Sequence, residues 1–110
     1  MRSPCPIASA LDLIGDKWTL LVVRDLMFFG KSRYGEFLDS PEGIATNILA
    51  DRLRRLEDGG IVVREGAGRR HDYRLTDKGE ALRPVLKSLI DWGLAHIPGV
   101  ATEPPPDYRG

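Results

Sequence analysis

The sequence has very little cysteine: Cys5 is the only one, so no disulfide can form within the chain. Small secreted domains commonly depend on several disulfides, and the composition therefore argues against that class. Residues 1–17 show no apolar run followed by a small-residue cleavage site, which is the pattern of a signal peptide. We therefore expect an intracellular, cytoplasmic protein.

The sequence also lacks a long hydrophobic run and a net charge. Its most apolar stretch, residues 18–29, is interrupted by Arg24 and Asp25. It is also shorter than the roughly 20 residues that a membrane-spanning helix needs. Lys plus Arg number 16 and Asp plus Glu number 16. This balance argues against a binder that holds nucleic acid by bulk charge, but it leaves room for a local basic surface.

Catalytic motifs are missing as well. His71 and His96 lie far apart in the sequence, and with a single cysteine they give no zinc-ligand spacing. There is no nucleophile elbow, no Walker loop and no dinucleotide-binding glycine motif, and the glycine-rich residues 65–70 read as a hairpin tip. The sequence therefore predicts a protein that is not an enzyme and that holds no metal or cofactor.

The 110 residues suffice for one domain with a real core, and their patterns predict an order of elements. These are a helix from Pro6 to Gly15, a buried helix after Asp16, an extended piece at residues 32–33, a short helix bearing Tyr34, a helix over 45–58, strands at 61–65 and 71–75, and a last helix capped by Thr76 and kinked at Pro84. Residues 98–110 are rich in proline and predict a disordered tail.

Two helices joined by a tight turn and followed by a two-stranded wing make up the winged helix-turn-helix plan. The predicted fold is therefore mainly α with a small β-hairpin, over residues 1–97. In this plan the N-terminal part of the second helix reaches base edges in the major groove of DNA. Thr46 and Asn47 occupy that end with short polar groups, and Ala50 leaves room for a close approach.

Further along the same helix, Arg52, Arg54 and Arg55 could reach phosphates or guanine. Asp51 would repel DNA unless it accepts a hydrogen bond from a cytosine amino group or orients Arg55 four residues later. The alternative is that these charges only solvate a surface helix.

Other basic residues are weaker candidates for the same surface. Arg69 and Arg70 at the hairpin tip suit phosphates or a narrow minor groove, or else only make the loop soluble. Lys31 and Arg33, before the short helix, are further phosphate candidates.

Several stretches together resemble the HxlR family of bacterial winged-helix transcriptional regulators: "CPI…ALDLIGDKWTLLVVRDL", "RYGEFL", "GIATNILADRLRRLEDGGIV", "DYRLTDKG" and "LRPVLKSLIDWG". The resemblance covers about residues 5–96. It implies a regulator that binds an operator in double-stranded DNA as a homodimer and that can respond to a small-molecule or redox effector. One departure is Ala45, which stands where the family usually has a serine, so a helix cap must come from Thr46 or be absent.

The resemblance also implies that the first and last helices form the dimer interface. The apolar residues there exceed what a small three-helix core needs, although a monomeric core remains the alternative. The predicted interface residues are Ile7, Leu11, Ile14, Leu86, Leu89, Ile90, Trp92 and Leu94.

Cys5 immediately precedes Pro6 and so is predicted at the N-cap of the first helix, where the helix dipole favours a reactive thiolate. In certain regulators of the HxlR type, an N-terminal cysteine followed by proline senses oxidants or electrophiles. The alternative is a small, semi-buried residue with no sensing role. For the whole chain, the runner-up function is a winged helix that binds another protein instead of DNA.

Overall fold

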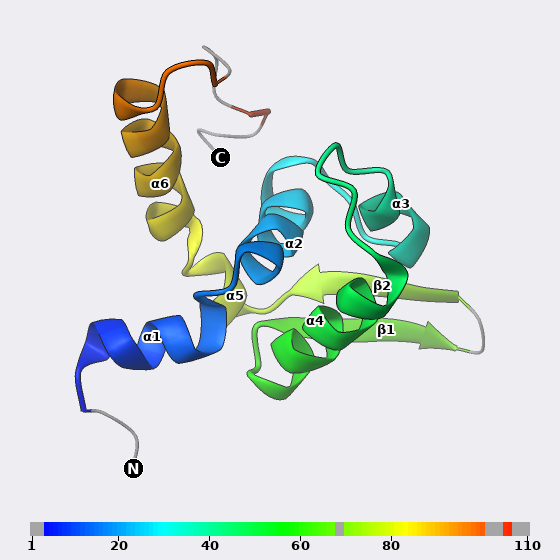
Figure 1. The fold of residues 1–110 in the computed structure, drawn as a ribbon. Coiled ribbons are helices and arrows are strands. Elements are labelled where there is room, and N and C mark those ends of the chain that lie inside the picture. The colour runs from blue at the N-terminus through cyan, green and yellow to red at the C-terminus, as the bar shows by residue number, and fades with distance from the viewer. Residues whose placement is uncertain (1–3, 68–69, 101–104, 107–110) are drawn as a thin grey trace.

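A computed structural model describes residues 4–67, 70–100 and 105–106 of the chain (Figure 1). Its elements follow one another as α1 (Pro6–Ile14), α2 (Lys17–Phe28), α3 (Tyr34–Leu38), α4 (Thr46–Asp58), β1 (Val62–Ala67), β2 (Arg70–Leu75), α5 (Asp77–Glu80) and α6 (Arg83–His96). The mainly helical chain with one antiparallel hairpin is the predicted winged helix-turn-helix fold. Most of the predicted tail lies outside the described residues, so its disorder stays a prediction.

The core lies where α2 packs against α4 and the hairpin, with α2 in the centre of the molecule (Figure 1). Val23 and Phe28 of α2 are completely buried, and the inward stripe of α4 consists of Leu49, Leu53 and Leu56. Because α2 is surrounded by the other elements, its apolar residues are spread around most of the helix. In the described part of the chain, no helix combines the length and the apolar character needed to cross a membrane.

The wing is longer than predicted and its connection is shorter. β1 and β2 pair from Val62 with Leu75 to Ala67 with Arg70, so only residues 68 and 69 separate the strands. The five-residue loop expected over 66–70 was therefore wrong. Gly66 continues the strand with a φ of 116°, a conformation that side chains rarely allow, and this lets a glycine-rich segment remain paired.

The predicted long last helix is in fact two helices. Thr76 caps α5 by accepting a hydrogen bond from the Gly79 N–H at 3.1 Å, as expected of a helix N-cap. The chain then breaks, and Pro84 lies in the first turn of α6 instead of kinking a continuous helix. A proline is tolerated in a first turn because its missing N–H would have no intrahelical partner there.

Close packing leaves no room for a side chain at Gly79, which follows the wing. A Cβ at this position would lie 2.3 Å from the Ile61 carbonyl oxygen and 2.9 Å from a methyl carbon of Leu75. The Thr76 hydroxyl donates to the Gly60 carbonyl oxygen at 2.6 Å and so ties the same turn to the end of α4. The Leu-Thr-x-x-Gly segment therefore holds α5 directly against the base of the wing.

An ion pair joins the start of α2 to the middle of α4. Asp16 caps α2 by accepting from the Thr19 N–H at 3.1 Å, and its carboxylate also accepts from Arg52 Nε at 2.7 Å. The hydrogen bond from Arg52 lowers the pKa of Asp16 from its ordinary 3.8 to about 2; partial burial opposes this change and the Thr19 N–H supports it. Charged Asp16 therefore fixes α4 against α2.

We expect Asp16→Asn to lower the free energy of unfolding by about 1–2 kcal/mol at neutral pH. Asparagine also caps helices well, so the loss reports mainly the charge-assisted hydrogen bond. Because the folded-state pKa is depressed, this stabilisation is complete above about pH 4 and declines as the pH falls through 2. Urea unfolding of both proteins from pH 7 to pH 3 measures the difference, which must begin to shrink below pH 4. A difference that stays constant down to pH 3, or its absence at pH 7, would contradict the role of the ion pair.

Candidate DNA-binding interface

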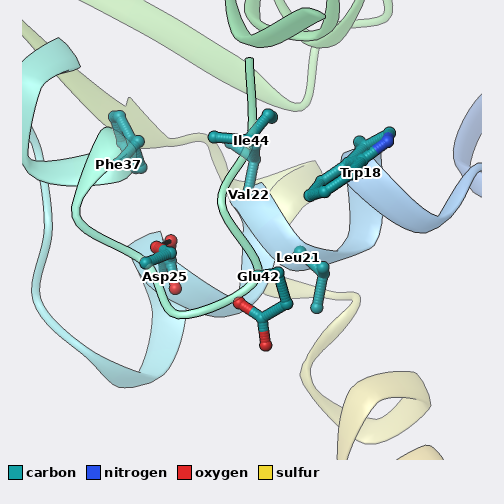
Figure 2. A pocket seen from close by; sticks show the side chains of 8 residues that line it. Trp18, Leu21, Val22, Asp25, Phe37, Glu42 and Ile44 are labelled. Atoms are coloured by element: carbon teal, nitrogen blue, oxygen red, sulfur yellow. Dashed lines mark hydrogen bonds between the residues drawn. The ribbon is translucent and has the colours of Figure 1, made fainter.

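A buried carboxylate organises the turn between α3 and α4. The Asp25 side chain, on α2, is 3% exposed and accepts from Arg24 Nε at 3.0 Å and from the Ser40 hydroxyl. Lys31 Nζ lies 3.6 Å from its second oxygen. Figure 2 shows Asp25 close to the loop that leads to α4. Since a buried charge is costly without partners, this arrangement holds the loop on α2.

The same network continues to the far end of the loop. Arg24 also donates to both carboxylate oxygens of Glu42, at 2.7 and 2.9 Å. The side chain of Ile44, two residues later, is buried. The hydrogen bonds from Arg24 lower the pKa of Glu42. The space between these groups is a hollow of about 10 Å³, at the lower limit for a single water molecule (Figure 2). It is a packing gap in the turn and too small for an effector.

Lys31 therefore has a structural position. Its Nζ donates to the Ser40 hydroxyl at 2.8 Å, and its side chain is only 21% exposed. The prediction of Lys31 as a phosphate contact does not fit this geometry, because the ammonium group of Lys31 is paired with the buried carboxylate of Asp25. Arg33 differs: its side chain is 58% exposed and its Nε lies 3.4 Å from Asp72 at the surface.

The outward face of α4 is the one predicted. Thr46, Asn47, Ala50, Arg54 and Arg55 are exposed while the opposite stripe is buried. Ala45 occupies the N-cap and supplies no side-chain hydrogen bond, so the cap that the sequence left open is absent.

The start of α4 is instead held from α3. The Tyr34 hydroxyl donates to the carbonyl oxygen of Thr46 at 2.6 Å. The sequence gave no signal for this contact, because the two residues are twelve apart and Tyr34 also fits the apolar pattern of α3. The hydroxyl fixes how the first turn of α4 is presented.

Arg52 faces the protein instead of the solvent. Its side chain is 16% exposed, with Nη1 2.6 Å from Asp51 and Nε 2.7 Å from Asp16. The prediction that it reaches phosphate or guanine therefore does not fit the structure. On the helix, Arg52 directly precedes the buried Leu53 and lies at the edge of the inward face. Its guanidinium group contacts Asp16 at the N-terminus of α2.

Asp51 lies among the arginines of α4. It is 3.3 Å from Arg54 Nη2 and 3.7 Å from Arg55 Nη1, in addition to its bond with Arg52. These contacts, that of Arg52 above all, lower the pKa of Asp51. The predicted pairing with Arg55 is thus present, and a second one with Arg54 accompanies it.

The wing carries two cations that the sequence reasoning missed. Arg64 on β1 and Arg74 on β2 are 48% and 64% exposed, and they face Glu57 at 3.9 Å and Glu65 at 2.8 Å. Because acidic side chains lie close to both, neither arginine belongs to a cluster of basic residues, and such clusters were the basis of the sequence prediction. Arg69 lies outside the described residues, and for Arg70 only the backbone is described, so the tip contacts stay predictions.

On the other side of the molecule, α1 and α6 extend away from the body (Figure 1). Ile7 and Leu11 are 71% and 56% exposed, while Leu89 and Trp92 are 52% and 60% exposed. An open groove of about 540 Å³ follows α6 along Pro84, Val85, Ser88, Leu89 and Trp92.

The remaining predicted interface residues are less available. Ile14 and Leu86 are buried in the core of the single chain, because they lie where α1 and α6 meet the body. Their assignment to a dimer interface does not fit this burial. Ile90 and Leu94 are half-buried.

Cys5 is exposed at the N-cap of α1, where the sequence placed it. Among the described residues, no three His, Cys, Asp or Glu side chains gather closely enough to hold a metal ion.

Comparison with known proteins agrees with this geometry. The model of the HxlR-like helix-turn-helix family matches residues 13–100. An HTH-type transcriptional regulator of Synechocystis is 42% identical over 92 residues, which cover 81% of this chain and 67% of the relative. A second such regulator, from Mycobacterium bovis, is 38% identical over 95 residues, and the match spans only 59% of its length.

Solved structures show the same fold. PA1607, described as a candidate transcription factor, has a TM-score of 0.81 and 44% identity, covering 91% of this chain and 72% of its own. The oxidised redox regulator HypR has a TM-score of 0.75 and 35% identity, with coverages of 84% and 97%. Quinone-bound YodB of B. subtilis has a TM-score of 0.68 and 36% identity, with coverages of 81% and 97%. This chain belongs to the HxlR-like helix-turn-helix family of transcriptional regulators.

Proposed function

We propose that the protein is a bacterial, cytoplasmic regulator that binds a pseudo-palindromic operator as a homodimer. In this proposal α4 enters the major groove and the wing contacts the backbone or the minor groove. The observation that carries it is the exposed polar face of α4, held rigidly by the Asp25 network on one side and by the Asp16–Arg52 ion pair on the other. A recognition helix must be fixed in this way if its side chains are to meet base edges in register.

The residues of α4 divide by position. Thr46 and Asn47, in the first turn, have the short polar groups that pair with adenine or contact a thymine methyl. Arg54 and Arg55 have exposed guanidinium groups suited to guanine or phosphate. Arg33 and the wing arginines can add phosphate contacts, which fix the register of the protein on DNA without reading sequence.

The decisive experiment is selection from randomised DNA duplexes with the purified protein, followed by mobility shifts at several salt concentrations. A recovered inverted repeat, bound more weakly as salt rises, supports the proposal. Failure to recover any preferred sequence would favour the alternative, a winged helix that binds another protein.

We expect Asn47→Ala to lower discrimination at one position of each half-site by about tenfold, because a bidentate asparagine–adenine pair is lost. Arg69→Ala should instead weaken binding to all sequences alike and reduce the salt dependence by about one ion. Affinities for the selected site and its single-base variants measure both effects. If the two variants had the same profile, this division between base reading and phosphate binding would be wrong.

For dimerisation, we propose that the exposed apolar faces of α1 and α6 meet their counterparts in a second copy. Leu89→Gln should raise the dimer dissociation constant at least tenfold, since it removes an apolar side chain from the centre of this face. Sedimentation velocity over a concentration series measures the change. Phe29→Gln is the matched control, because Phe29 is 44% exposed but lies at the end of α2. Equal effects from both variants, or a wild-type monomer, would contradict this interface.

For the signal, we propose that an oxidant or electrophile modifies Cys5. The support is the exposure of Cys5 beside α1, together with the redox and quinone-bound states of HypR and YodB. A quinone would add to the thiolate and form a thioether, while an oxidant would join Cys5 to a partner's cysteine or a small thiol. We expect benzoquinone to lower operator affinity at least tenfold in the wild type and not in Cys5→Ser. An unmodified Cys5 by mass spectrometry, at full DNA affinity, would reject the idea.

A further inference from the structure

The exposed face of α4 contains a carboxylate where DNA would bring negative charge. Asp51 is 38% exposed and contacts three guanidinium groups. A carboxylate at this place weakens the attraction of the helix for phosphates. Its presence on the face proposed to meet DNA therefore calls for an effect other than affinity.

The position of Asp51 is fixed from behind. Arg52 uses Nη1 for Asp51 Oδ2, at 2.6 Å, while its Nε is bound to Asp16 at 2.7 Å. Since Asp16 caps α2, the carboxylate of Asp51 is held by a chain of charges anchored in a second helix. An isolated surface ion pair would not be restrained in this manner.

The front of Asp51 faces the two exposed arginines. Its Oδ1 accepts from Arg54 Nη2 at 3.3 Å, and its Oδ2 lies 3.7 Å from Arg55 Nη1. The Arg54 side chain is 72% exposed and that of Arg55 is 49% exposed, so each retains donors that face the solvent. One carboxylate therefore restrains two long, otherwise mobile side chains before DNA arrives.

We propose that Asp51 is a positioning and specificity-determining residue, which orients Arg54 toward guanine and makes contacts with phosphate alone less favourable. This inference rests on the proposed function. A guanidinium pre-oriented by a carboxylate loses less side-chain entropy when it forms two hydrogen bonds with guanine. Its partial neutralisation by Asp51 weakens attraction to any backbone, whatever the sequence, and discrimination between sites rises.

Asp51→Asn tests the inference, because it keeps the shape and removes the charge. We expect three- to tenfold tighter binding to scrambled DNA and a loss of guanine preference at one position of each half-site. The measurements are selection from randomised duplexes with the full chain, and dissociation constants for the selected and scrambled sequences. The thermal unfolding midpoint should change by no more than a few degrees, since Arg52 keeps its bond to Asp16.

Asp58→Asn is the matched control. Asp58 is an exposed carboxylate at the C-terminal end of α4, and the described part of the chain gives it no ion pair. Its substitution removes the same charge from the same helix, but in the described part of the chain Arg54 and Arg55 pair with Asp51 and not with Asp58. If Asp58→Asn reproduced the change in guanine preference, or if Asp51→Asn left that preference intact, the positioning role would be overturned.

Arg54→Ala provides a second route that does not depend on the folding of the Asp51 variant. It leaves the contact between Asp51 and Arg52 in place and must remove the guanine preference at the same position. Retention of that preference would also overturn the inference. A wild-type protein that selects no sequence at all would instead reject the proposed function itself, so the two failures are distinguishable.

Discussion

The buried carboxylate of Asp25 is the constraint on which the helix-turn-helix geometry depends. It lies within α2 with 3% of its side chain exposed, and its partners come from the loops on either side of α3 as well as from α2 itself. Without these partners the interior would contain a charge that it cannot solvate. The loop over residues 39–44 is therefore held at a fixed distance from the core, and α4 begins where that loop ends.

The four arginines of α2 and α4 form two groups that differ in burial and in their carboxylate partners. Arg24 and Arg52 are mostly covered and join α2 to the turn and to α4. Arg54 and Arg55 extend from the opposite face, and among the described residues they pair only with the partly exposed Asp51. Arg24 and Arg52 each pair with two carboxylates, so their charges are offset within the fold.

The molecule presents its two candidate surfaces on different sides. The polar face of α4 and the wing lie on one side of α2, and the apolar faces of α1 and α6 extend from the other (Figure 1). Cys5 lies at the start of α1, next to the apolar face and away from α4. A modification there would act on the proposed dimer and reach DNA through the spacing of the two recognition helices.

The sequence by itself determined most of the elements and their order, because apolar spacing, caps and glycines are local signals. It did not show the break between α5 and α6 or the full length of the wing. Asp16 and Thr76 as caps and the inward stripe of α4 were predictable for this reason. Only the tertiary structure decided which charged residues face a neighbour. In the sequence Lys31 and Arg52 resemble free cations, but in the fold each lies beside a carboxylate that is buried or far away in the sequence. Ile14 and Leu86 likewise fit the pattern of interface residues, but both are buried in the core of the single chain. Helical periodicity gives the direction of a side chain, but its partner depends on residues far away in the sequence.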